Sequence, residues 1–578
     1  MLVRWKLLRF RAELEDCLFL LFSVWVSAAL YLWWLGFYSD DWAFLGTLTL
    51  SDDQSLPGLI RTFFTEKPDD WVRPVKGLYH VVLYSLFGLQ PLGFHLVNTT
   101  VLMLGVVLFY LVLRELNQNR YLALALPLVY GLLPHYSTDR FWYAASQANL
   151  SMALYFLNLY CDLRTLRAGS RFLWGWKALA LASLLGSCLA YEVFMPLFIL
   201  NAVIVLGQTR RMRSSWPVNS AVSPGKLALV FGGGNLLSLL LVVSFKKLVS
   251  ERARAFGFPG IMLFIRAPLD VTYDDYGIGL PRVLWRILRL YPNPVVLASA
   301  GVLALLVFSY LYRMPGSLEA EPLKGSRMLI LIVGGLAVSA LTYAFLYGTG
   351  WSAPAPPRAR VSAPTYAFLI GTAGTGINNR TVIAAAIGVA CSIVGWLGWS
   401  SSLLAPRELR VRVFYILIAV VCAIGFLINN VIATFWIAAS RRQQTILADI
   451  RQHFPSLPPR TTLLLDGFCP YIGPGIVFET SWDVSGALQI IYGDRTLKGD
   501  VVKPNTRVGD DGISTFIYTL KKRYPYQNLL VYNVRRKSSY PLTDAKTART
   551  LFAGFKTDST SSCPTGREGY GAEIFKTD

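Results

Sequence analysis

Long apolar runs alternate with short polar stretches through the first 440 residues of the chain. A helix needs about 20 residues to cross a hydrocarbon core of about 30 Å, and several runs reach that length. We expect the shorter runs to tilt or to lie buried within a bundle. Because a spanning segment must satisfy its own backbone hydrogen bonds, all of them are predicted to be helices. About eleven spans are predicted, at 16–37, 94–114, 121–134, 146–163, 176–191, 193–208, 226–245, 291–312, 328–349, 381–404 and 412–439.

The polar connections predict the orientation of these spans. Basic residues precede the first span and recur at 164–171 and 209–215. Because Lys and Arg gather on the cytoplasmic side, we expect a cytoplasmic N-terminus and outer loops at 38–93 and 246–290. No small-residue cleavage site follows the first apolar run, so we expect a retained helix rather than a signal peptide. Within the first outer loop, residues 75–91 are amphipathic and are expected to lie along the membrane surface.

The pattern changes after residue 440, where the long apolar runs stop. Short apolar runs bounded by Gly, Asp and Pro predict strands at 461–468, 486–493 and 528–534. Residues 446–454 predict a helix. The chain is therefore predicted to be mainly α, with a polytopic helical bundle at 1–439 and a small extracytoplasmic α/β domain at 440–578.

Two cysteines and several aromatic and basic residues lie in this C-terminal region. An exported compartment permits disulfides, so Cys469 and Cys563 are a candidate pair, with two free thiols as the alternative. Residues such as Tyr471, Trp482 and Arg535 suit contact with a polysaccharide. They equally suit an ordinary domain surface.

Composition supports a membrane protein and excludes several classes of function. The 578 residues are 54% hydrophobic and 15% charged, which is too apolar for a soluble protein of this length. The net charge of +21 is explained by topology and by contact with anionic lipid or phosphate, and no nucleic-acid module is present. The sequence has no Cys/His cluster typical of zinc sites, no Walker A loop, no GxSxG and no HExxH.

The stretch YLWWLGFYSDDWAFLG at 31–46 places two adjacent acids where the first span ends. Asp40 and Asp41 can supply a general base for an acceptor hydroxyl. They can also hold a divalent metal ion through oxygen ligands, although no cofactor is certain. The alternative is a solvated pair of residues at a helix boundary.

Three further polar residues follow in the same loop. Arg73, Lys76 and His80 are three or four positions apart, so on a helix they can share one face. A guanidinium and an ammonium on one face suit a phosphate group. The alternative is an interfacial helix whose basic side chains contact lipid head groups.

The segment 134–150 combines charge with aromatic surface. His135, Asp139 and Arg140 lie beside Trp and Tyr residues, an arrangement that suits a sugar, whose faces are partly apolar and whose rim carries hydroxyls. The alternative is an aromatic belt at the membrane interface.

Two more charged residues lie next to apolar spans. Glu192 separates two of them, and an acid at membrane depth is a functional candidate, with a solvated outer turn as the alternative. Arg380 precedes a late span, where it can hold a lipid-linked phosphate or anchor the helix.

The order of these features resembles a known superfamily. An acidic pair after the first span, then RPV, then GFHLVNTTVLMLGVVLFYLVLREL at 93–116, and YE before VFMPLFIL are similar to membrane glycosyltransferases of the GT-C superfamily. The resemblance covers roughly residues 10–245. The second acid is Asp, not the Glu of the protein mannosyltransferases, and the WWDxG motif of oligosaccharyltransferases is absent.

The resemblance implies an enzyme that takes a sugar from a polyprenyl-phosphate carrier on the extracytoplasmic face. The acceptor would be a glycan, lipid or protein, and transfer would usually invert the anomeric centre. Asp40 or Asp41 would act as base or place the acceptor, and Arg73, Lys76 and Arg380 would steady the departing phosphate. Some members use a divalent metal ion and others use none.

Three hypotheses follow for a protein expected in the inner membrane of a bacterium. The first is a glycosyltransferase of cell-envelope glycan synthesis. The second is a transporter or flippase of a lipid-linked glycan, in which the same groups bind without reacting. The third is a non-catalytic membrane scaffold that recruits partners through residues 440–578.

Overall fold

The computed structural model describes most of the chain, and the structural statements below concern those residues. They are 2–167, 170–212, 224–249, 280–290, 292–314, 324–348, 381–404, 406–503, 505–517 and 520–559. Arg380, Cys563 and most of the predicted outer loop 246–290 lie outside them.

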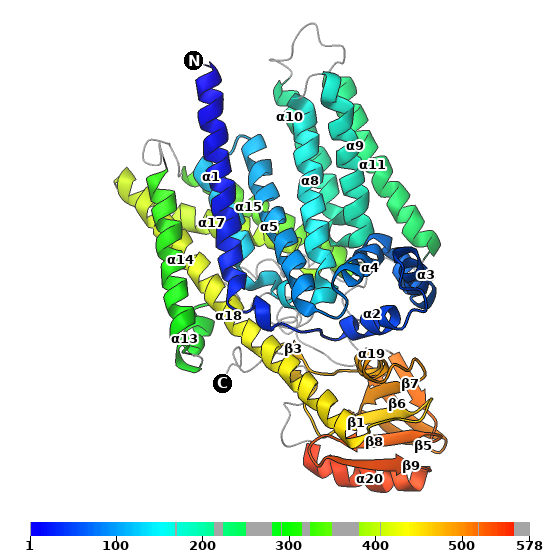
Figure 1. Ribbon diagram of the computed structural model, residues 1–578. Helices are drawn as coiled ribbons and strands as arrows, with labels where there is room; N and C mark the ends of the chain where they lie inside the picture. Colours follow the sequence, from blue (N-terminus) through cyan, green and yellow to red (C-terminus); the bar gives the residue numbers. More distant parts are fainter. Residues whose placement is uncertain are drawn as a thin grey trace.

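The membrane part is a bundle of long helices, as predicted (Figure 1). Among the described residues, eight helices are long and apolar enough to cross a membrane by length and composition. They are α5 (Pro91–Glu115), α9 (Ser170–Ala190), α10 (Met195–Met212), α11 (Pro224–Val249), α14 (Pro294–Arg313), α15 (Gly325–Gly348), α17 (Ala385–Ser402) and α18 (Arg407–His453). The other three predicted spans correspond to α1 (Leu2–Ala29), α6 (Arg120–Leu132) and α8 (Gln147–Arg167), but α1 ends eight residues before the predicted end of the first span at residue 37. The mainly α class is therefore confirmed.

Charged residues inside the bundle are paired. The Nζ of Lys177 donates to Asp162 Oδ1 at 2.8 Å and to Asn235 Oδ1 at 2.7 Å, which ties α9 to α8 and α11. Arg120 donates twice to the Asp16 carboxylate, at 2.8 and 2.7 Å, and joins α6 to α1. An ion in a low-dielectric interior is tolerated when it is paired, so these groups hold helices together.

Short helices gather at one end of the bundle, opposite the N-terminus and next to the C-terminal domain (Figure 1). Between α1 and α5 the chain forms η1 (Leu32–Trp34), α2 (Asp40–Thr49), α3 (Leu56–Glu66), η2 (Pro68–Val72) and α4 (Pro74–Phe87). Between α6 and α8 it forms η3 (Pro134–Tyr136), α7 (Thr138–Phe141) and η4 (Tyr143–Ala145), and η5 (Glu192–Phe194) precedes α10. The amphipathic segment predicted at 75–91 is thus a helix, α4. The candidate residues of the first loop all belong to this end.

The C-terminal region contains a mixed α/β unit. A four-stranded sheet has the order β4-β1-β8-β9, in which β4, β1 and β8 are parallel and β9 is antiparallel. A three-stranded antiparallel sheet β5-β6-β7 and a short β2-β3 pair accompany it. The elements are β1 (Thr462–Asp466), β2 (Tyr471–Ile472), β3 (Gly475–Ile476), α19 (Ser481–Tyr492), β4 (Lys498–Val501), β5 (Arg507–Gly509), β6 (Gly512–Ile517), β7 (Leu520–Tyr524), β8 (Leu529–Asn533), β9 (Ser538–Leu542) and α20 (Ala545–Ser559).

One predicted strand is wrong, because residues 486–493 belong to helix α19. Thr480 and Asp483 form a capping box at its start, and Gly493 ends it with a φ of 67°. Both are sequence signals of helix termini. The apolar run alone did not distinguish a short strand from a buried helix face.

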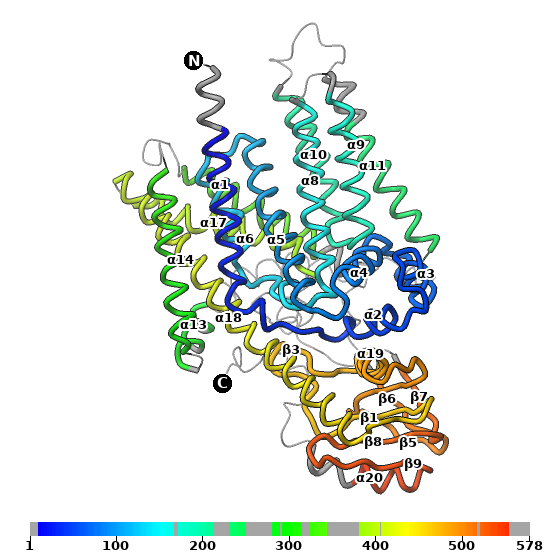
Figure 2. Tube along the Cα trace, in the orientation of Figure 1, coloured from blue at the N-terminus to red at the C-terminus, as the bar shows by residue number. Residues whose placement is uncertain are grey.

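Helix α18 continues through residue 440, the predicted domain boundary, and carries the chain from the bundle to the sheet (Figure 2). The first strand begins at Thr462. The division of the chain into two domains stays a prediction.

Candidate functional site

Asp41 is buried, and both of its carboxylate oxygens accept backbone hydrogen bonds. The amide of Tyr38 donates to Oδ2 at 2.8 Å, and the amide of Ala144 donates to Oδ1 at 2.7 Å. Burial raises the pKa of Asp41 well above its usual range. Asp41 therefore joins the first loop to the turn between α7 and α8, and its oxygens are already occupied.

Asp40 is in a different environment from its neighbour. It is half-buried at the first position of α2. No hydrogen bond or ion pair from a described residue reaches its carboxylate, although Lys67 and Glu479 are close enough for their pKa values to respond to its charge. Of the two acids, Asp40 has oxygens available to accept a proton from a ligand.

Ser39 links this acid pair to the C-terminal domain. Its hydroxyl donates to Glu479 Oε1, and the indole Nε1 of Trp482 donates to the same hydroxyl at 3.2 Å. Glu479 also accepts from the Tyr471 hydroxyl at 2.6 Å. The φ of Ser39 is 46°, a conformation that costs a non-glycine residue about 1–3 kcal/mol. Contacts with Glu479 and Trp482 of the C-terminal domain therefore hold Ser39, a strained residue, immediately before Asp40.

Helices α2 and α19 then pack backbone against backbone. A Cβ at Gly486 would clash with the carbonyl of Trp42, and a Cβ at Gly46 would lie 3.2 Å from the Cα of Gly486. Only small residues allow helices to approach so closely. The helix that begins with Asp40 is consequently fixed against the C-terminal domain along its length.

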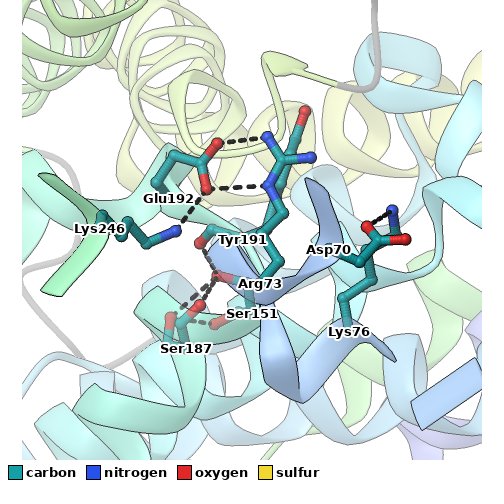
Figure 3. Close-up of polar contacts among 8 residues, drawn as sticks. All are labelled: Asp70, Arg73, Lys76, Ser151, Ser187, Tyr191, Glu192 and Lys246. Atoms are coloured by element: carbon teal, nitrogen blue, oxygen red, sulfur yellow. Dashed lines mark hydrogen bonds and ion pairs between the residues drawn. The ribbon is translucent and has the colours of Figure 1, made fainter. Parts of the chain in front are cut away.

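Glu192 is the centre of a buried ionic group, the Glu192 group, formed with Arg73 and Lys246 (Figure 3). Arg73 donates from Nε to Oε2 at 3.1 Å and from a second nitrogen to Oε1, while Lys246 donates to Oε2 at 2.9 Å. The exposed fractions of the side chains are 5% for Glu192, 16% for Arg73 and 13% for Lys246. Two cations share one carboxylate, so the group has a net positive charge.

Neighbouring contacts fix the position of this group. The guanidinium of Arg73 lies over the ring of Tyr191, 4.7 Å from its centroid. The hydroxyl of Ser151 donates to the carbonyl of Tyr191 at 2.9 Å and contacts Ser187 (Figure 3). Helix α8 thus holds the backbone next to Glu192, while the two cations hold its carboxylate.

Lys76 and His80 have partners of their own. Lys76 donates to Asp70 at 2.8 Å and lies over Phe44, 4.6 Å from the ring centroid. His80 contacts the Tyr143 hydroxyl through Nδ1, and its Nε2 is buried without a hydrogen-bond partner among the described residues. Burial, with Lys76 nearby, lowers the pKa of His80 well below its usual value. A phosphate site shared by Arg73, Lys76 and His80 stays a prediction.

Electrostatic contacts connect the Glu192 group with the acid pair. Asp70 is close enough to Arg73 to act on its charge. Burial lowers the pKa of Lys67, while Asp70 and Asp40 oppose that shift. Electrostatic interactions therefore connect Arg73 with Asp70, Asp70 with Lys67, and Lys67 with Asp40.

The predicted sugar-facing residues of 134–150 are buried. Asn98 and Asn149 both donate to the carbonyl of Asp139 at 2.8 Å. Arg140 donates to the Ser27 hydroxyl at 3.2 Å and to the carbonyl of Gly131. These contacts fix the turn within the bundle.

His135 is also buried, and burial lowers its pKa to about 3. A sugar-binding role for His135, Asp139 and Arg140 stays a prediction.

The remaining candidates are only partly described. Arg380 lies outside the described residues. Cys469 is disulfide-bonded, and Cys563, its predicted partner, also lies outside them. Within the described part of the chain, no group of three or more His, Cys, Asp or Glu residues is arranged to hold a metal ion.

Sequence reasoning missed three residues of this site. Lys246 and Lys247 follow the predicted span 226–245 at its extracytoplasmic end, where Lys is expected to be rare. This unusual position was a sequence signal that could have identified Lys246 as a candidate. Lys67 and Glu479 carry no comparable signal, because only the fold brings a residue after α3 and a residue before α19 next to Asp40.

No protein-family model matches the chain, and no curated protein matches it in sequence. Two solved structures are similar to it. One is the crystal structure of ArnT from Cupriavidus metallidurans bound to undecaprenyl phosphate, at 15% identity and a TM-score of 0.33, covering 83% of this chain and 89% of that chain. The other is ArnT from the same organism in the apo state, at 15% identity and a TM-score of 0.30, covering 77% and 82%. At these TM-scores neither match carries an argument about the site.

Proposed function

We propose that this protein is a membrane glycosyltransferase that moves a sugar from a polyprenyl-phosphate carrier to a hydroxyl acceptor, with Asp40 as the general base. The observation that carries the proposal is the contrast between the two adjacent acids. Asp41 uses both oxygens to hold backbone amides, while Asp40 has oxygens available at the end of the bundle that also holds the Glu192 group.

The chemistry needs a base on one side of the anomeric carbon and cations on the other. The Asp40 carboxylate takes the proton of the acceptor hydroxyl as the acceptor oxygen bonds to the anomeric carbon. The bond between that carbon and the phosphate oxygen breaks, and its electron pair leaves with the polyprenyl phosphate. The anomeric centre is inverted, and protonated Asp40 releases its proton to water.

The Glu192 group is suited to the departing phosphate. Its two cations are held in place before the reaction, so they need no reorganisation when negative charge develops. Arg73 supplies a planar fork of donors and Lys246 a point charge. The bulk of the bundle around them is apolar, which strengthens their effect on a nearby anion.

The remaining parts of the hypothesis concern the setting. We place the N-terminus in the cytoplasm and the C-terminal domain outside, because basic residues occupy the first turns of α1 and the two lie at opposite ends of the bundle (Figure 1). The acceptor is a glycan, lipid or protein of the cell envelope. Membrane lipid surrounds the bundle.

The test compares Asn substitutions of two acids in the first loop. Purified protein in lipid nanodiscs is given a radiolabelled polyprenyl-phosphate sugar and an envelope extract as acceptor. We expect Asp40→Asn to lower the rate of transfer by about 10²–10⁴-fold without loss of donor binding, because it removes a general base. Asp52→Asn, which changes an exposed acid of the same loop, should leave the rate unchanged.

The same assay separates the alternatives. A flippase moves the lipid-linked glycan across a liposome membrane without transferring sugar, and a scaffold does neither. Full transfer activity in Asp40→Asn would rule out Asp40 as the base.

A further inference from the structure

A hollow in the C-terminal domain is lined by cations. Its volume is about 440 Å³, within the range of about 300–1,000 Å³ typical of small-molecule pockets. Four of the lining residues are Arg460, Lys498, Lys522 and Arg523, and no Asp or Glu is among the residues that line it. We call it the basic pocket.

Three of these cations have no carboxylate partner among the described residues. Arg523 pairs with Asp511, but Arg460, Lys498 and Lys522 form no ion pair there. Two other exposed cations of the same domain are paired, Lys537 with Asp449 and Arg549 with Asp510, at 2.9 and 2.8 Å. The lining therefore combines several cations with no acid, and an anionic ligand would balance its positive charge.

The rest of the lining is polar and rich in hydroxyls. Thr462, Ser481 and Ser485 contribute hydroxyls, and Gln527 and Asn528 contribute amides. The aromatic lining residue, Tyr524, is only 6% exposed, and its hydroxyl donates to Asp500 at 2.8 Å. Nucleic-acid sites without sequence preference stack bases on open aromatic faces. This lining suits a hydroxyl-rich carbohydrate instead.

The pocket also adjoins the proposed catalytic acid. Ser481, in its wall, is followed by Trp482, whose indole donates to Ser39, and Ser39 precedes Asp40. Lys522, also in its wall, is close enough to Lys67 to lower the pKa of that residue, whereas Asp40 raises it. The wall of the pocket is thus linked to Asp40 through Trp482 and Ser39, and through the shared neighbour Lys67.

We propose that the basic pocket binds the phosphate or carboxylate of an acidic carbohydrate acceptor and holds it beside Asp40. The identification as an acceptor rests on the proposed function. Binding of the acidic carbohydrate does not, because it depends only on the lining.

Binding is measured on the full-length protein in nanodiscs of phosphatidylcholine, by isothermal titration calorimetry at low salt. The probes are an oligogalacturonate, an oligomannose carrying a terminal 6-phosphate and a neutral malto-oligosaccharide. We expect one or both acidic probes to bind at least about tenfold more tightly than the neutral one, because hydrogen bonds to charged groups contribute most. The two acidic arms distinguish carboxylate from phosphate.

Two sets of variants locate the binding. The double variant Lys498→Gln with Lys522→Gln should weaken binding of the preferred acidic probe by about tenfold or more. Lys521→Gln, the matched control on the adjacent strand position, does not line the pocket and should leave binding unchanged. All three lysines are exposed, so unfolding midpoints should not change.

Several results would overturn the proposal. They are equal binding of the neutral probe, an equal loss in Lys521→Gln, or tighter binding of single-stranded DNA of the same charge. Asp40→Asn separates the two proposals. If it abolishes transfer while the pocket variants bind and transfer normally, the pocket fails alone. If the pocket variants lose binding of the acidic probe, but neither the wild type nor any variant transfers sugar, the proposed function fails alone.

Discussion

The Glu192 group and the basic pocket use cations in opposite ways. In the first, Arg73 and Lys246 are buried and share a carboxylate, whereas in the second, Lys498 and Lys522 are exposed and form no ion pair with a described residue. The difference follows from solvation. Burying an ion without a partner costs several kcal/mol of folding free energy, while an exposed lysine keeps its hydration and stays available to bind a ligand. Buried cations can therefore be oriented in advance, and exposed cations can select an anion.

Removing the carboxylate of the Glu192 group should have the largest effect on stability. Glu192→Gln leaves two buried cations without their counter-charge, and we expect the free energy of unfolding to fall by about 3–5 kcal/mol. The measurement is SDS-induced unfolding in mixed micelles. Glu66→Gln is the matched control, because Glu66 is an acid with a single, exposed partner. Equal effects of both changes would contradict the distinction between buried and exposed charge.

The two adjacent acids extend the comparison to carboxylates. Asp41→Asn keeps one oxygen but turns an amide group toward a backbone N–H, so a buried donor loses its acceptor. We expect a loss of about 1–3 kcal/mol in the same unfolding measurement. Asp40→Asn should change stability by less than about 0.5 kcal/mol, since no described residue bonds to Asp40. The opposite order would show that Asp41, not Asp40, is the available acid.

The sequence predicted the helical class, because long apolar runs are local features, and the acid pair made the first loop a candidate site. It predicted Glu192 and Arg73 as candidates, but not that they form one group. Their pairing joins η5 to the residue before α4, and such contacts depend on how the helices pack. Glu479 and the basic pocket could not be predicted for the same reason. The strand predicted at 486–493 failed because a short apolar run fits a buried helix face equally well.

Glu479 should make the contact between the loop and the C-terminal domain dependent on pH. Burial raises its pKa, and the charged groups that act on it are Asp40, Lys503 and Asp483. A carboxyl group with a raised folded-state pKa gives its full stabilisation below its unfolded value of 4.5, and loses it as pH rises through the folded pKa.

The pH at which this contact loosens can be measured by limited proteolysis of the C-terminal domain in nanodiscs. We expect protection to decline as pH rises above about 4.5, by at most about 1.4 kcal/mol per pH unit for one proton. Glu479→Gln mimics the protonated form and should flatten the part of the slope that Glu479 contributes. Asp41 and Asp483 titrate in the same direction, so the informative quantity is the difference between wild type and variant. A variant with the wild-type slope would assign the pH dependence to those other acids.

The smallest effect on stability is expected at an exposed ion pair between the first loop and the C-terminal domain. Arg495 contacts Glu66 at 2.8 Å, with side chains 42% and 36% exposed. Such pairs contribute about 0–1 kcal/mol, because water already solvates both ions and salt screens them. Arg495→Gln should therefore lower stability by less than about 1 kcal/mol, and the difference should shrink further in 0.5 M NaCl, where the screening length is shorter. The Arg495 guanidinium also contacts the carbonyl of Leu50, so a larger and salt-independent loss would show that this backbone contact, rather than the ion pair, secures the domain.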